Sequence, residues 1–82
     1  MRDACLQTAS DAARALRLGL RAEGNQRVLT LVEQLGHYFA TDEGIARGAE
    51  ISPVLPAIVA SQERGDDIAV ADLLEYELAP RL

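Results

Sequence analysis

Apolar residues recur at helical spacing along most of this chain. Near the start they follow one another at steps of three and four, and small side chains dominate the stripe, which comprises Cys5, Ala9, Ala12, Leu16 and Gly19. Polar residues, among them Gln7 and Ser10, occupy the opposite face. Small residues let a partner helix approach closely, so the pattern predicts a helix over residues 3–22 that packs on another helix.

A second stripe follows a short break. Gly24 favours the left-handed conformation that ends a helix, and Asn25 can cap the next one. The apolar positions Val28, Val32, Leu35 and Phe39 then predict a helix that continues to about residue 40. A turn this short makes the two helices an antiparallel hairpin.

The second half repeats this organisation with weaker signals. Two glycines interrupt residues 41–52, which we interpret as a connection, with at most one helical turn around Ile45. A helix follows, beginning at Pro53 or at Pro56 and burying Val54 and Ile58, because proline is tolerated only in the first turn. Gly65 and Asp66 end it, and a last helix covers residues 67–78. Alternatively, the last two helices fuse through Gly65 into one bent rod, since a helical glycine costs only about 1 kcal/mol.

These elements predict one all-α domain over residues 1–82, an antiparallel helical bundle of two hairpins at 3–40 and 53–79. A chain of 82 residues with one Phe, two Tyr and no Trp builds a small core from aliphatic side chains and alanine. Small helical domains often compensate by oligomerising. We therefore expect dimerisation to complete the bundle, either as a homodimer or with a permanent protein partner.

The charge, the single cysteine and the hydropathy of the chain limit the kinds of partner and the cellular compartment that we expect. The chain has 13 acidic residues and 8 basic ones, all arginine, for a net charge of −5, which repels nucleic-acid phosphates. The arginine usage is typical of a GC-rich bacterial genome. One cysteine cannot form an internal disulfide, and neither a signal peptide nor a membrane span stands out. We expect a cytoplasmic bacterial protein that binds neither nucleic acid nor membranes.

No residue pattern predicts catalysis. The only histidine, His37, falls on the polar face of its predicted helix, and Cys5 falls on an apolar one, where a thiol acts as a small hydrophobe. Asp72 and Glu75 share a helical face, but two carboxylates without His or Cys are too common to indicate a metal site. We therefore expect no enzymatic activity, no metal and no cofactor.

The candidate interaction residues lie in the first and last predicted helices. On a helical wheel, Glu77 shares a sector with Leu73 and other apolar residues, so it is either a buried acid paired across an interface or a side chain that bends into water. Tyr76 is predicted to pack in the core or a dimer interface. Arg14, Arg17 and Arg21 form a basic line, which is either solvated or meets the acidic last helix of the same chain, a second copy or another protein.

The last nineteen residues carry a resemblance. Gly65 and Asp66, the run Ala71 to Leu78, and Pro80 resemble the C-terminal signature of a group of small, uncharacterised bacterial helical proteins. The segment is also loosely similar to flagellar export chaperones, in which a Gly-Asp break precedes a leucine-rich acidic helix. This resemblance implies a chaperone or adaptor role. From the residues themselves we expect a noncatalytic protein–protein interaction module or, alternatively, a purely structural subunit of a homo-oligomer.

Overall fold

The computed structural model describes all 82 residues, and every regular element in it is helical. The all-α class predicted from the sequence is therefore confirmed. The elements are α1 (Arg2–Arg17), α2 (Arg21–Tyr38), α3 (Asp42–Ile51), α4 (Val54–Glu63), α5 (Asp67–Asp72), a π-helical segment η1 (Leu73–Leu78) and a 3-10 turn η2 (Ala79–Arg81).

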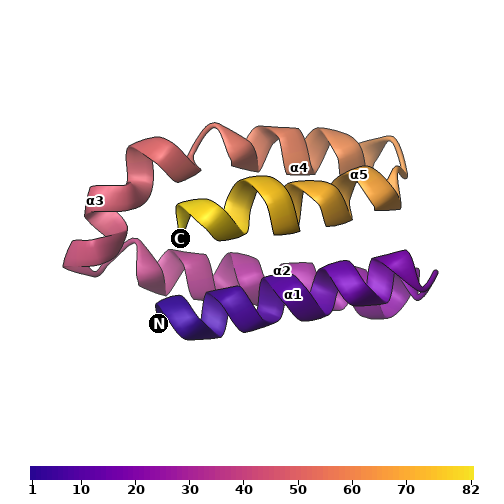
Figure 1. Ribbon diagram of the computed structural model, residues 1–82, viewed down its shortest axis with the longest axis horizontal. Helices are drawn as coiled ribbons and strands as arrows, with labels where there is room; N and C mark the ends of the chain where they lie inside the picture. Colours follow the sequence, from indigo (N-terminus) through magenta and orange to yellow (C-terminus); the bar gives the residue numbers. More distant parts are fainter.

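The helices form two layers, each made of two antiparallel helices, and α3 joins the layers at one end (Figure 1). One layer contains α1 and α2, and the other contains α4 and the continuous rod of α5 and η1. Helix α1 is the central element, because it packs against α2 on one side and against α5 and η1 on the other. Helices α2 and α4 are thus the outer members of the bundle, and neither packs extensively on the other.

The core lies where α1 meets its neighbours. The face of α1 that lines this core is the small-residue stripe predicted from the sequence. Its residues Cys5, Ala9 and Ala12 are essentially inaccessible to solvent. Leu16, Leu31, Tyr38, Ile51, Leu74 and Leu78 are the largest side chains in this core. The alanines allow the helices to approach closely, so α1 can contact its own hairpin partner α2 and the last helix of the second hairpin at once.

The first helical break lies earlier than the sequence predicted. Helix α1 ends at Arg17, and the turn is made by Gly19, whose φ of 79° is the left-handed conformation that glycine adopts without strain. Gly24, expected to end the first helix, instead lies inside α2 and is buried against Leu16. The sequence pattern placed Gly19 on the apolar stripe of the first helix and Gly24 at the break, whereas in the structure Gly19 makes the turn and Gly24 is required by close packing.

Residues 41–52 are also more regular than predicted, because ten of them form helix α3. Thr41 caps this helix: its Oγ1 accepts a hydrogen bond from the Gly44 amide at 3.0 Å and donates one to the Tyr38 carbonyl at 2.6 Å. Asp42 and Glu43 favour the positive end of the helix dipole. The two glycines weakened the sequence pattern without preventing the helix.

The second break agrees with the prediction. Gly65 has a φ of 69°, and the Asp66 side chain accepts a hydrogen bond from the Ala69 amide at 3.0 Å, capping α5. The alternative in which the last two helices fuse into one rod is therefore wrong. Pro56 lies in the first turn of α4, where backbone amides have no intrahelical partner, so it removes no hydrogen bond.

The last helix changes its winding between α5 and the C-terminus. From Leu73 to Leu78 the hydrogen bonds follow the wider π pattern, and Pro80 comes just after, without an amide to donate to the carbonyl of Tyr76. The wider turns bring Val70, Leu74 and Leu78, each four residues apart, to the buried side. No helix in the structure has both the length and the apolar character that crossing a membrane requires.

Candidate functional site

The larger of two concave features is an apolar groove between α2 and α4, which we call the α2/α4 groove. It arises because α1 and η1 hold the two layers together while α2 and α4 remain apart. The cavity in it has a volume of about 340 Å³. Its lining consists of Val28, Leu31, Val32, Leu35, Gly36 and Phe39 from α2 and its end, Leu55, Ile58, Val59 and Gln62 from α4, and Leu74 and Leu78 from η1.

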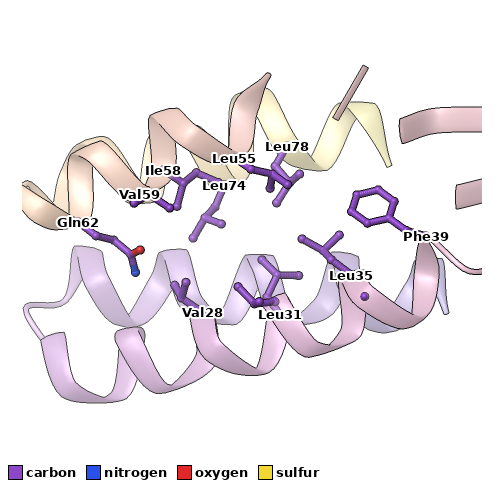
Figure 2. A pocket seen from close by; sticks show the side chains of 12 residues that line it. Val28, Leu31, Leu35, Phe39, Leu55, Ile58, Val59, Gln62, Leu74 and Leu78 are labelled. Atoms are coloured by element: carbon purple, nitrogen blue, oxygen red, sulfur yellow. The ribbon is translucent and has the colours of Figure 1, made fainter. Parts of the chain in front are cut away.

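Figure 2 shows how these side chains face one another. Val28, Leu31 and Leu35 point up from α2, and Leu55, Ile58 and Val59 line the opposite wall. Phe39 lies at one end and the Gln62 amide at the other. Leu74 and Leu78, both fully buried, come from the π-helical segment. Such segments occur frequently at functional sites, which makes the groove a candidate docking surface.

The mouth of the groove exposes apolar side chains to solvent. Val32 on α2 is 59% exposed and Val59 on α4 is 50% exposed, although both are aliphatic. Leu29 extends the apolar surface along α2, and Gly36 leaves an open space, with no atom within 4 Å of where its Cβ would lie. Contiguous exposed apolar surface of this kind marks interaction sites more often than single exposed residues do.

Helix α4 lacks the polar face expected of a surface helix. No residue from Val54 to Gln62 is charged, yet Pro56, Ala57 and Val59 are exposed. A surface helix normally presents charged or polar residues opposite its buried stripe. The outer side of α4 is therefore more apolar than an exposed helix face normally is.

The predicted arginine line contacts the acidic last helix of the same chain. Arg17 donates hydrogen bonds to Asp72 at 2.9 Å and to Glu75 at 3.3 Å, and these two carboxylates raise the pKa of Arg17. Arg21 donates to Asp67 at 2.9 Å. Arg14 is exposed and has no carboxylate within ion-pair distance. Two of the three arginines thus hold the hairpins together, on a side of the molecule that does not line the groove.

Two of the three candidate residues of the last helix, Tyr76 and Glu77, point away from the core. Tyr76 is 67% exposed, with the Arg17 guanidinium 5.8 Å from its ring centroid, so it does not pack in the core of its own chain, and its packing in a dimer interface stays a prediction. Glu77 is exposed and forms an ion pair with Arg81 at 2.8 Å, so it is not a buried acid. Leu73 is half-buried at the edge of the core. The π winding rotates these residues away from the sector that a regular wheel gave them.

The remaining candidates for chemistry stay isolated from one another. Cys5 is buried, and this burial raises the pKa of its thiol. His37 is exposed on α2, as predicted from the polar face. The chain contains no group of three His, Cys, Asp or Glu side chains arranged to hold a metal ion.

Tyr38 is the one fully buried side chain with an unpaired polar atom. Its hydroxyl lies in the core without a hydrogen-bond partner in the protein. Burial, and secondarily the negative charge of Glu43, raise the pKa of Tyr38 above its usual value. Because the protein supplies this hydroxyl with no hydrogen bond, no protein contact offsets the cost of its desolvation.

We predict that Tyr38→Phe stabilises the protein by about 1 kcal/mol, because it removes this cost. Because the folded-state pKa of Tyr38 is raised, the unfolded state loses the phenolic proton at a lower pH than the folded state does. The free energy of unfolding of the wild type is therefore unaffected by this proton below the unfolded pKa of about 10 and falls at higher pH. The advantage of the variant should therefore grow above pH 10. Urea denaturation at pH 7 and in steps to pH 11 measures both effects. A variant less stable than the wild type at pH 7 would contradict the prediction.

The groove was not recognised from the sequence, although its signals were present. The stripe Val28, Val32, Leu35 and Phe39 predicted a helix, and in the structure these residues line the groove, with Val28 and Leu35 buried and Val32 exposed. The second signal was the absence of charge over residues 54–62. Which of two apolar faces remains uncovered depends on how the hairpins pack, which the spacing of residues within one helix does not encode.

A short part of the chain is similar to a known protein. The chain is 55% identical over 31 residues, 38% of its length, to an uncharacterised protein of Treponema pallidum (strain Nichols). The match spans only 16% of that protein. The chain matches no protein-family model. No solved structure matches it. The similarity associates the chain with an uncharacterised bacterial protein.

Proposed function

We propose that this chain is a noncatalytic protein–protein interaction module whose docking surface is the α2/α4 groove. The observation that carries the proposal is the pairing of an apolar groove of about 340 Å³ with exposed Val32 and Val59 at its mouth. A groove between two helices, lined by aliphatic side chains, suits the apolar face of another helix. A chaperone or adaptor that shields such a face would use this surface.

The charge distribution favours the groove over the arginine line as the docking surface. Arg17 and Arg21 already bond to acidic residues of the same chain, so a partner would have to displace these bonds. The groove lining, by contrast, contains one polar side chain, Gln62, and no charged one. Covering it removes apolar surface from water without breaking an ion pair.

Site-specific photo-cross-linking in the native cell tests this proposal. A benzophenone amino acid in place of Val59 is expected to give discrete protein adducts, because it lies at the mouth of the groove. The matched control carries the same group at Ser10, an exposed residue of α1. Adducts from position 10 with none from position 59 would contradict the proposal, as would their absence from both.

A further inference from the structure

We infer that the occupant of the α2/α4 groove is a second copy of this chain, an inference that rests on the proposed function of the groove. In this arrangement, two copies dock across a two-fold axis, and α4 of each copy lies along the groove of the other. Val59 of each copy then enters the apolar space beside Val32 of its partner. Such an interface is isologous, as in most soluble homodimers.

Charge is the first argument for a second copy. Each chain carries a net charge of −5, so two copies repel one another wherever their charged surfaces meet. The groove lining carries no charged side chain, and α4 carries none from Val54 to Gln62. This face is therefore where two copies can approach without bringing like charges together. A strongly charged partner would find no complementary charge in the lining.

Shape is the second argument, because the same face offers both a groove and a projecting side chain to fill it. Val59 of α4, half-exposed at the mouth of the groove, is the projecting side chain. Gly36 on the opposite wall leaves open space that a helix can approach closely. A two-fold interface requires one surface to complement itself, and this face meets that requirement.

Size is the third argument. The chain exposes 4688 Å² and measures 36 × 20 × 17 Å. A stable dimer interface takes about 800 Å² from each partner. That is about one sixth of this surface, and one long side of the molecule can supply it. An interface centred on the groove would also cover the exposed Leu29 and Val32 of α2.

Sedimentation velocity of the purified chain, from about 5 to 500 μM, tests the inference. The wild type is expected to sediment as a dimer at the higher concentrations. Val59→Glu should weaken dimerisation by at least about 100-fold, because each interface would then contain two added carboxylates near one another. Leu18→Glu is the matched control, since Leu18 is 68% exposed outside the groove, and its dimerisation should remain within about 3-fold of wild type.

Gly36→Ala separates docking from folding. Beyond the backbone of its own helical turns, no atom of the chain lies within 4 Å of the added methyl group, so the variant should be as stable as the wild type or more stable, because alanine favours a helix. The same methyl group occupies the space that the partner helix approaches, so dimerisation should weaken by about 10-fold or more. Circular dichroism confirms the fold of each variant before sedimentation.

Three outcomes would overturn the inference: a wild-type monomer at 500 μM, a dimer that Val59→Glu leaves intact, or equal weakening by Leu18→Glu. The inference and the proposed function can be contradicted independently of one another. If the chain is monomeric but the probe at position 59 cross-links to a different protein in the cell, the groove is a docking surface and its occupant is not a second copy. If position 59 yields no adduct of either kind, both proposals fail.

Discussion

Replacing Gly44 with alanine is expected to destabilise the fold by about 2–4 kcal/mol, although alanine ordinarily favours a helix. An added Cβ at this position would overlap the backbone carbonyl of Tyr38 and lie 2.9 Å from the Cα of Phe39. These atoms belong to the end of α2 and cannot move as a flexible side chain can. The cost therefore includes shifting one helix relative to another and disturbing the Thr41 cap.

Gly48→Ala provides the matched control, because Gly48 lies one turn later in the same helix and an added Cβ meets no atom within 4 Å. It should stabilise the protein by about 0.5–1 kcal/mol, the usual gain from glycine to alanine in a helix interior. Urea denaturation of both variants measures the contrast. Equal effects at the two positions would show that Gly44 does not pack closely against the Tyr38 carbonyl.

The second large effect is expected from the contact between Leu16 and Gly24. A Cβ added at Gly24 would lie 2.5 Å from Cδ2 and 2.6 Å from Cγ of Leu16, a buried side chain of α1. Gly24→Ala should therefore cost about 1–3 kcal/mol through overpacking. Leu16→Ala should cost about 2–5 kcal/mol through the cavity it leaves.

The double variant should be more stable than the sum of these effects predicts, by about 2 kcal/mol, because the alanine at position 24 enters the space that Leu16 vacates. Urea denaturation of the four proteins, with a stabilising osmolyte where a variant is too weakly folded, gives the coupling free energy. Additive effects would mean that α1 and α2 separate to admit the methyl group, and that Gly24 is not required by close packing.

The glycines of this chain also show which features of the fold the sequence could predict and which it could not. Apolar spacing predicted the all-α class, the hairpin organisation, the buried small-residue stripe of α1 and the break at Gly65. It misplaced the first break, because Gly19 and Gly24 are both glycines and only tertiary contacts distinguish a turn from a close helix approach. It also missed α3, which holds two glycines and whose cap depends on one threonine hydroxyl.

The candidate site was less predictable than the fold. A wheel with the regular helical period put Glu77 among apolar residues, whereas the π winding before Pro80 turned it toward Arg81. The arginine line was predicted either to be solvated or to meet the acidic last helix of the same chain, a second copy or another protein, and in the structure Arg17 and Arg21 bond to that helix within one chain. The groove depends on α2 and α4 remaining apart, which is a property of the whole packing arrangement and not of either helix.

The two ends of the chain meet in space. The side chain of Arg2 donates a hydrogen bond to the carbonyl of Leu82 at 3.0 Å, although 80 residues separate them in sequence. A longer polypeptide that carried this unit would enter and leave it at a single point, so the unit can interrupt a surface loop of a host domain with little entropic cost of closing that loop. Residues added at one end of the chain would therefore begin beside the other end.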